Sequence, residues 1–352
     1  MNTGERVDRY WTLSGTSLGP MPQVADFELR EGSIPVPRRG QALTRTIYIS
    51  LDPYQWLYKK QGIDRPGAVC HARTVAQVIE SRMAGFAPGD FVFNTNGWRE
   101  YGLMGEGIER PSYMNPRKLD PNAARISQAV GVLGMLGLTA YAGMLLQCSP
   151  RHGETAVVSA ASGGVGQIAA QLARLHGARV VGIAGREEKQ RYVVEELGLD
   201  ECVSHLSATF AQDLKAACPN GIDVYFENVG GHVFDAIASL FNAGARMSLC
   251  GVISQYTEDR PQETKGALLE RSKLELEKRG VCVHELFVGD FVAEHQERFL
   301  RDMSAWVASG KIKYREDIRQ GIETVPQAFV EMMRGDNFGK TLVQVSPDPT
   351  LA

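Results

Sequence analysis

A glycine-rich turn is the part of the sequence whose residue types and spacing suggest a specific chemistry. Segment 161–166 reads Ala-Ser-Gly-Gly-Val-Gly between a short apolar run and a helical pattern. Gly163 would let the backbone approach a pyrophosphate, and Gly166 would let the helix pack on the strand. The helix start adds free N–H groups and a positive dipole end. The pattern is AxGxxG, and its position between strand and helix predicts a dinucleotide site rather than a turn without ligand. The site would comprise Ala161, Gly163, Gly164, Val165 and Gly166.

The residues after the next predicted strand indicate which dinucleotide binds. An acid at the end of that strand would bind the adenosine ribose and repel a 2′-phosphate. The strand here ends in Ile183-Ala-Gly-Arg186, and the first acid is Glu187. Arg186 and Lys189 supply two cations, and Tyr192 adds a hydroxyl one helical turn later. This combination favours NADPH; the alternative is a solvated helix start whose acids offset the cations.

The elements that would position this turn alternate along the middle of the chain. Short apolar runs predict strands, and amphipathic segments between them predict helices. This alternation predicts a parallel sheet covered by helices on both faces. The expected strands are 155–160, 179–184, 222–227 and 246–250, and the expected helices are 129–146, 164–176 and 187–197.

Both ends of the chain have a different pattern. The first ~120 residues contain short alternating runs, such as 41–49 and 74–79, separated by Gly and Pro turns, which predicts antiparallel β structure. Beyond residue 306 the sequence predicts strands at 311–315 and 341–345 and a helix at 325–333. These late elements would complete the first domain.

Composition excludes several classes of protein. The chain has 352 residues, and its 38 Lys and Arg against 41 Asp and Glu give a net charge of −3. That near balance argues against nucleic-acid binding, which needs a basic surface. The sequence has no apolar run of the ~20 residues that span a bilayer and no signal-like start, so we expect a cytoplasmic protein without a membrane partner. The six cysteines form no CxxC pair and are expected to be reduced thiols.

Several further segments carry a family resemblance that covers nearly the whole chain. The sequence resembles the medium-chain dehydrogenase/reductase superfamily. Within it, the chain is similar to the zinc-independent branch of leukotriene B4 dehydrogenases, prostaglandin reductases, alkenal double-bond reductases and curcumin reductase. The Glu-Asn-Val-Gly-Gly and Ile-Ser-Gln-Tyr sequences are specific to this branch. The matching segments are 50–54, 97–101, 133–143, 181–185, 221–231, 251–256, 310–316 and 337–340.

The resemblance implies an α/β architecture with two domains. A Rossmann domain, residues 126–305, would bind NADPH, and a GroES-like, mainly β catalytic domain would combine residues 1–125 and 306–352. It also implies an oxidoreductase that reduces the carbon–carbon double bond of an α,β-unsaturated ketone or aldehyde, a small-molecule enone or enal. Tyr54 and Tyr256 would face the substrate. Matched by motif, the cofactor residues would be Gly163, Gly166, Lys189, Tyr192, Asn228 and Asn337.

Two segments depart from the family pattern. After Asp52-Pro-Tyr54 the family usually continues Met-Arg-Gly-Arg, whereas this chain has Gln-Trp-Leu-Tyr-Lys-Lys at 55–60. The family usually has a glycine-containing stretch before its next strand, and here segment 69–74 reads Val-Cys-His-Ala-Arg-Thr. Since both segments border the substrate pocket in the family, the natural substrate is expected to be unusual.

Three other functions share part of this sequence pattern. A zinc alcohol dehydrogenase needs a Cys, a His–Glu pair and a further Cys or Asp. His71 lies near the expected His, but Ala72 follows it, so we expect no metal site. An NADPH:quinone reductase shares fold and cofactor, and the Ile-Ser-Gln-Tyr segment favours enone reduction instead. An NADPH-binding protein without turnover is the non-enzymatic alternative.

Tyrosine is the expected donor to the reacting oxygen. Hydride transfer to the β-carbon of an enone moves negative charge to the carbonyl oxygen, where the site must place donors. A tyrosine hydroxyl, with an unperturbed pKa of about 10, stays protonated at neutral pH. Tyr256 follows a Rossmann strand end, and Tyr54 comes from the other domain. Asp52 and Pro53 are interpreted as an N-cap and first-turn proline, which places Tyr54 and Tyr58 on one helix face.

The resemblance also implies a homodimer. Relatives pair through the edge of the Rossmann sheet, and segment 281–286 is the candidate edge strand. An apolar edge left uncovered is a liability that a symmetric partner would remove.

Overall fold

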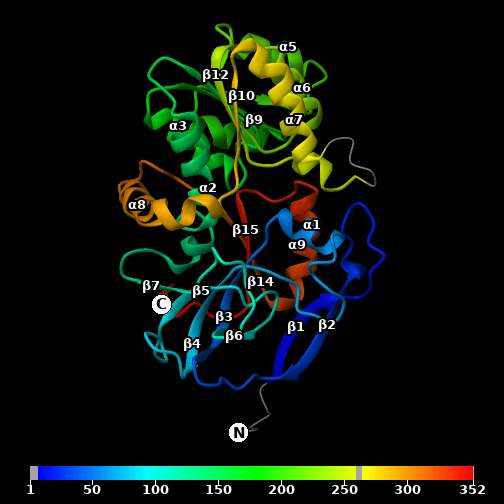
Figure 1. Cartoon of the computed structure of the whole chain (residues 1–352), viewed down its shortest axis with the longest axis vertical. Helices are drawn as coiled ribbons and strands as arrows, with labels where there is room; N and C mark the ends of the chain where they lie inside the picture. Colours follow the sequence, from blue (N-terminus) through cyan, green and yellow to red (C-terminus); the bar gives the residue numbers. More distant parts are fainter. Residues whose placement is uncertain (1–6, 259–263, 352) are drawn as a thin grey trace. The chain divides into compact units, whose positions relative to one another are not determined.

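The computed structural model describes residues 7–258 and 264–351, and the chain divides into two compact units. Unit 1 combines Met1–Gly131 with Glu316–Ala352, and unit 2 is Val132–Arg315. The sequence predicted these boundaries six and ten residues earlier, after residues 125 and 305. A 3-10 helix, Ile126–Val130, packs into the core of unit 1, which moves the first boundary. In Figure 1 unit 1 is coloured blue, cyan and red because it is built from both ends of the chain.

Unit 1 is mainly β. Its seven-stranded sheet has the order β14-β15-β3-β4-β5-β7, and β6 pairs with β3. The pairs are antiparallel except that of β14 with β15. β1 and β2 form a separate antiparallel hairpin. The strands are β1 Val7–Leu13, β2 Phe27–Ser33, β3 Gln41–Ser50, β4 Thr74–Ser81, β5 Phe91–Asn94, β6 Tyr101–Gly105, β7 Arg117–Leu119, β14 Glu316–Gln320 and β15 Lys340–Gln344.

Two helices of unit 1 matter for the site. α1 (Tyr54–Lys60) directly follows β3, and α9 (Val325–Met333) precedes β15. Trp56 of α1 is fully buried against Phe329 of α9, with ring centroids 6.4 Å apart. The Trp56 indole N–H donates to the carbonyl of Pro20 at 2.6 Å. Trp56 is therefore a core residue, and it anchors the helix that carries Tyr54.

Unit 2 is a six-stranded parallel sheet with the order β10-β9-β8-β11-β12-β13. This order reverses direction between β8 and β11, which is the arrangement of a dinucleotide-binding Rossmann sheet. The predicted fold class is confirmed for both units. The strands are β8 Thr155–Val158, β9 Arg179–Ala184, β10 Glu201–Ser204, β11 Ile222–Glu227, β12 Phe241–Leu249 and β13 Cys282–Glu285.

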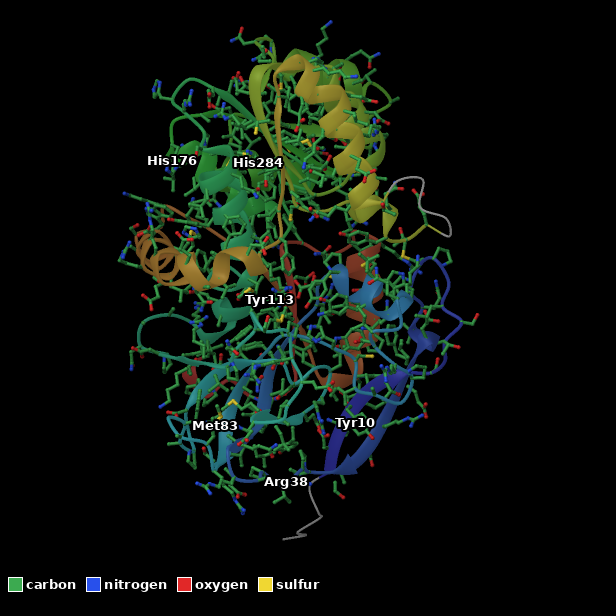
Figure 2. The ribbon with its side chains drawn as sticks, viewed as in Figure 1. Tyr10, Arg38, Met83, Tyr113, His176 and His284 are labelled. Atoms are coloured by element: carbon green, nitrogen blue, oxygen red, sulfur yellow. The ribbon has the colours of Figure 1, made fainter. Side chains whose placement is uncertain are left out.

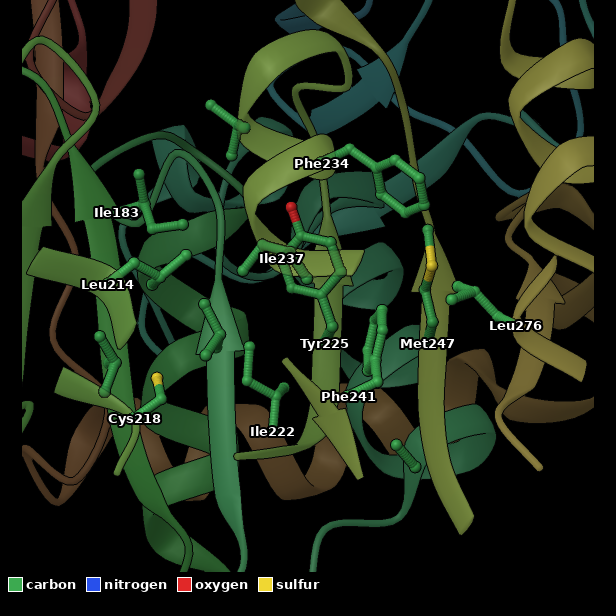
Figure 3. Packing of buried hydrophobic residues seen from close by; sticks show 14 of the residues in the cluster. Ile183, Leu214, Cys218, Ile222, Tyr225, Phe234, Ile237, Phe241, Met247 and Leu276 are labelled. Carbon is green, nitrogen blue, oxygen red and sulfur yellow. The ribbon is translucent and has the colours of Figure 1, made fainter. Parts of the chain in front are cut away.

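Helices cover the sheet of unit 2. On one face, buried side chains of α5, α6 and α7 form a continuous core with those of the strands (Figure 3). Helix α3 and a π-helical turn (Ala142–Cys148) also pack on the sheet strands. Among the described residues, no helix has both the length and the apolar character needed to cross a membrane. The helices are α2 Met135–Tyr141, α3 Gly166–Leu175, α4 Glu187–Arg191, α5 Phe210–Ala217, α6 Gly231–Ala238, α7 Lys265–Leu276 and α8 Gly289–Ala308.

Two predicted elements were wrong in their extent. The helix expected over 129–146 begins only at Met135, because non-helical backbone at Gly131 and Gly134 interrupts it. The strand expected at 311–315 is irregular, and the strand is β14, which starts at Glu316. The backbone N–H groups of Lys313 and Arg315 donate to glutamine side chains of α3 instead of a sheet neighbour.

Candidate functional site

The glycine-rich turn after β8 is fixed by close backbone contacts. Ala160 has a positive φ of 50°, and its carbonyl accepts from the Gly163 N–H at 2.9 Å. A Cβ on Gly166 would lie 2.1 Å from the Ala160 oxygen, so a side chain there would displace the turn. A Cβ on Gly163 would lie 3.2 Å from the same atom. Gly166 therefore allows α3 to start directly against the strand, as the sequence predicted.

The turns after β8 and β11 are joined at the point where the strand order reverses. The Asn228 backbone N–H donates to the Ser159 hydroxyl, and its side-chain amide donates to the Ser159 carbonyl, both at 2.8 Å. The buried Glu227 carboxyl accepts from the Ser159 hydroxyl at 2.9 Å and the Val229 N–H at 2.6 Å. Burial raises the pKa of Glu227 despite these donors. Ligands bind parallel sheets at this switch point, so the two turns form one side of the candidate cofactor site.

The candidate 2′-phosphate residues lie at the end of β9. Arg186 is exposed, whereas Lys189 is only 9% exposed. Tyr192 is buried, and its hydroxyl donates to Gln167 at 2.7 Å. Burial lowers the pKa of nearby His205, and the positive charge of Lys189 lowers it further. The two cations that the sequence singled out therefore flank one strand end, and the Tyr192 hydroxyl holds α3.

Tyr256 lies in the turn after β12, the next strand of the same sheet. It ends a short 3-10 helix, Ile253–Gln255, whose first N–H donates to the Asn228 carbonyl at 3.0 Å. The Tyr256 hydroxyl lies 3.1 Å from the position that a Cβ on Gly251 would take. Burial raises the pKa of Tyr256 to about 12. Tyr256 thus carries a hydroxyl that stays protonated at neutral pH, and the 3-10 helix before it is hydrogen-bonded to Asn228.

Tyr54 and its neighbours form an aromatic cluster in unit 1. The Tyr54 hydroxyl lies 3.0 Å from Nε2 of His71. The Tyr54 and Tyr58 rings meet edge to face with centroids 5.0 Å apart, as their expected shared helix face requires. Tyr113, labelled in Figure 2, is hydrogen-bonded to Tyr58, and burial raises its pKa to about 12. The cluster combines the two segments in which the sequence departs from the family pattern.

Asp52 does not cap α1, so that interpretation was wrong. The cap position is Pro53, and no side chain caps the helix start. The Asp52 carboxylate is buried and lies 2.8 Å from both the Arg73 guanidinium and the Lys340 ammonium. Burial would raise the pKa of Asp52, but these two cations outweigh it and hold that pKa below its usual range. Asp52 thus links the residue before β4, the first residue of β15 and the start of α1.

A second buried ion pair lies beside the aromatic cluster. The Lys59 ammonium donates to Asp64 at 2.7 Å, and both side chains are buried. Lys59 also lies 4.6 Å from the centre of the Trp98 ring. Neither ion network was predicted from the sequence. A lysine on the buried face of a short helix and an arginine next to a buried strand were the available signals.

The remaining predicted residues are placed as follows. Asn337 belongs to unit 1 and lies in the turn before β15, where its amide donates to the Gly339 carbonyl at 3.0 Å. Tyr54 also belongs to unit 1, and the other predicted site residues all belong to unit 2. Among the residues that the structure describes, no three His, Cys, Asp or Glu side chains are grouped so as to hold a metal ion.

The chain is similar to known proteins along almost its full length. Residues 164–283 match the family described as zinc-binding dehydrogenase, and residues 9–109 match the N-terminal domain of oxidoreductase. It is 38% identical to the NADPH-dependent curcumin reductase of Escherichia coli (strain K12), covering 99% of this chain and 100% of that protein. It is 34% identical to prostaglandin reductase 1 of Bos taurus, covering 95% and 98%.

A solved structure agrees with these sequence matches. CurA from Vibrio vulnificus, determined in complex with NADPH, has a TM-score of 0.85 and 39% sequence identity to this chain. The match covers 97% of this chain and 100% of that one. The similarity therefore includes both units.

Proposed function

Because the chain belongs to the medium-chain dehydrogenase/reductase superfamily, in its zinc-independent branch of enone and alkenal reductases, we propose that it reduces carbon–carbon double bonds with NADPH. The substrate is a small α,β-unsaturated ketone or aldehyde. The observation that carries the proposal is sequence similarity. The chain is 34–38% identical, over nearly its whole length, to prostaglandin reductase 1 and curcumin reductase. The geometry of the two joined turns supports it.

The residues of unit 2 fit a pyridine dinucleotide. Gly163 and Gly166 carry no Cβ at this turn, and the turn leads into the N-terminal end of α3, whose dipole favours a phosphate. Lys189 and Arg186 supply the positive charge for a 2′-phosphate. The buried Tyr192 keeps α3 in place through Gln167, and Asn228 completes the proposed set of unit 2. When bound, NADPH supplies a hydride from C4 of its nicotinamide.

Tyr256 is the proposed donor to the carbonyl oxygen. As hydride reaches the β-carbon, that oxygen becomes negative, and a fixed donor lowers the barrier. Burial keeps the Tyr256 hydroxyl protonated at neutral pH. Its turn is bonded to Asn228, so the donor is held at the same end of the sheet as the cofactor turns. Tyr54 of unit 1 is the second candidate donor.

The activity is tested by NADPH consumption against a panel of enones, enals and quinones, with product analysis. Saturated ketones or aldehydes are expected, and reduction of quinones alone would refute the proposal. NADPH deuterated at both C4 positions should leave deuterium on the β-carbon. Label on the carbonyl carbon would instead indicate an alcohol dehydrogenase.

The role of Tyr256 is tested by Tyr256→Phe. Turnover should fall by about 10- to 1000-fold, the scale of losing one oxyanion donor, with little change in NADPH affinity. Tyr141→Phe is a matched control, because that hydroxyl in unit 2 donates to Asp302 at 3.0 Å. Full turnover in Tyr256→Phe would refute its role and make Tyr54 the next candidate.

A further inference from the structure

The Tyr54 hydroxyl has a single polar partner within residues 7–258 and 264–351. That partner is Nε2 of His71, at 3.0 Å. A hydroxyl has one proton, so it donates either to His71 or to another acceptor. For Tyr54 to deliver its proton to a substrate, the His71 nitrogen must be the donor in this pair. Proton transfer from Tyr54 to a substrate therefore requires that His71 supply the replacement proton.

His71 is held rigidly by the buried ion pair next to it. Its backbone N–H donates to Oδ2 of Asp64 at 3.1 Å. The same oxygen accepts from the Lys59 ammonium at 2.7 Å. The Tyr58 ring packs against the imidazole at an angle of 41°, with centroids 5.6 Å apart. Because both backbone and ring are fixed, the distance between Nε2 and the Tyr54 oxygen is fixed too.

The charges around His71 favour a neutral ring. Burial lowers the pKa of His71 to about 4; the Asp64 carboxylate opposes this shift, and the Lys59 and Arg73 cations reinforce it. A neutral imidazole carries one proton and has one free acceptor nitrogen. It can accept a proton at Nδ1 while it releases one at Nε2.

The second nitrogen of His71 is open to receive that proton. The ring is half-buried, and Nδ1 is not among the buried polar atoms that lack a partner. No protein group in the described part of the chain bonds to it. The imidazole therefore stands between solvent on one side and the Tyr54 hydroxyl on the other.

We propose that His71 is a positioning residue that relays protons from water to Tyr54, and that Tyr54 protonates the α-carbon of the substrate. The proposal rests on the reductase function above. The Tyr54 O–H bond breaks as the α-carbon–hydrogen bond forms. The Tyr54 oxygen takes the proton from Nε2 of His71, and Nδ1 takes one from water. One solvent proton is consumed for each hydride transferred, and the ring stays neutral throughout.

Arg73 supports this step. Its guanidinium carbon lies 5.4 Å from the centre of the Tyr54 ring. A cation at this position stabilises the negative charge that develops on the tyrosine oxygen while its proton departs. Tyr54 would thus supply the proton to carbon, whereas donation to the carbonyl oxygen is the role proposed for Tyr256. The two tyrosines have different tasks.

The test compares His71→Ala and His71→Gln with the wild type. Both variants should lose about 100-fold in kcat, the lower end of what a positioned proton transfer contributes, with NADPH affinity and Tm unchanged. The solvent isotope effect on kcat should increase because protonation becomes slow, and the effect of C4-deuterated NADPH should decrease. Added imidazole should restore turnover to His71→Ala in proportion to its concentration. Tyr54→Phe should not be restored.

The controls separate the relay from folding and from the reductase proposal. His176→Ala should leave kcat unchanged, since that ring in unit 2 bonds to the Leu172 carbonyl. His71→Gln keeps an N–H for Tyr54 but cannot take and release protons at two nitrogens. This variant therefore tests the relay even if the alanine variant is unfolded. Folded His71 variants with wild-type kcat and isotope effects would overturn the relay alone. Wild-type protein that leaves no deuterium on the β-carbon would overturn both proposals.

Discussion

The buried carboxylate of Asp52 offers a quantitative test of how unit 1 is held together. Asp52→Asn keeps the shape of the side chain but removes the charge that lies 2.8 Å from both Arg73 and Lys340. Two buried cations are then left without their anion. Breaking a buried ion pair in this way costs about 3–5 kcal/mol. The Ser50 hydroxyl, 2.6 Å from Asp52, loses its charged acceptor as well.

Tryptophan fluorescence can follow the loss of stability in unit 1. The chain has four tryptophans, and Trp11, Trp56 and Trp98 are buried in unit 1, whereas Trp306 belongs to unit 2. Tryptophan fluorescence during urea unfolding therefore reports mainly on unit 1. With a slope of about 2 kcal/mol per M, a loss of about 3–5 kcal/mol lowers the midpoint by roughly 1.5–2.5 M.

A surface pair provides the control. Arg179 and Glu201 lie 2.7 Å apart, but their side chains are 38% and 45% exposed. Glu201→Gln should therefore cost under about 1 kcal/mol. A free energy of unfolding for Asp52→Asn within about 0.5 kcal/mol of the wild-type value would refute the reasoning.

The pH dependence provides a second check on Asp52. The folded protein lowers the pKa of this carboxyl below its unfolded value of about 3.9. The stabilisation is therefore complete above pH ~4 and is lost as the pH falls through the folded pKa. The stability difference between wild type and Asp52→Asn should be constant from pH 5 to 7 and shrink below pH ~4. A difference that stays constant down to pH 2 would contradict this linkage.

Four further predictions follow from the cofactor unit and from the family. In fluorescence titrations, Lys189→Ala should weaken NADPH binding by roughly 10- to 150-fold and leave NADH binding nearly unaffected. The reason is that one charge-assisted hydrogen bond contributes about 1.5–3 kcal/mol. Equal use of both cofactors by the wild type would contradict this prediction. Gly166→Ala should weaken binding of both cofactors, since the new Cβ would meet the Ala160 oxygen at 2.1 Å; unchanged affinity would refute the role given to that contact. Activity should survive a chelator, and one tightly bound zinc per chain whose removal abolishes turnover would overturn metal independence. Sedimentation should give a dimer formed through the exposed edge of β13, which includes His284 (Figure 2), and a monomer at micromolar concentration would count against it.

Local patterns account for what the sequence could predict. The glycine-rich turn, the strands around it and α9 are specified by neighbours within a few residues, so periodicity and turn chemistry were sufficient. Tyr54 and Tyr58 are four residues apart on a helix, and their contact follows from helix geometry. The helix expected over 129–146 failed where glycines coincide with the unit boundary, since there the backbone leaves one unit for the other.

The ion networks could not be predicted because their partners are distant in sequence. Asp52 and Lys340 are 288 residues apart and meet only through the pairing of β15 with β3. An Asp-Pro pair before a helix matches a capping signal, and nothing local distinguishes that role from a buried salt bridge. The hydrogen bond between Tyr54 and His71 likewise requires the loop between α1 and β4 to fold back on the helix.

The way β15 inserts into the sheet of unit 1 has a consequence for synthesis on the ribosome. β15 pairs with β3 on one side and β14 on the other, and its Lys340 neutralises Asp52. When residues 1–131 emerge, β3 therefore lacks one neighbour and Asp52 lacks one of its cations. Unit 2 is a single continuous segment and can fold before residues 1–131 acquire their missing strand. The nascent chain thus carries an open sheet edge through the translation of some 180 residues, and a ribosome that stalls before residue 340 leaves that edge exposed to aggregation.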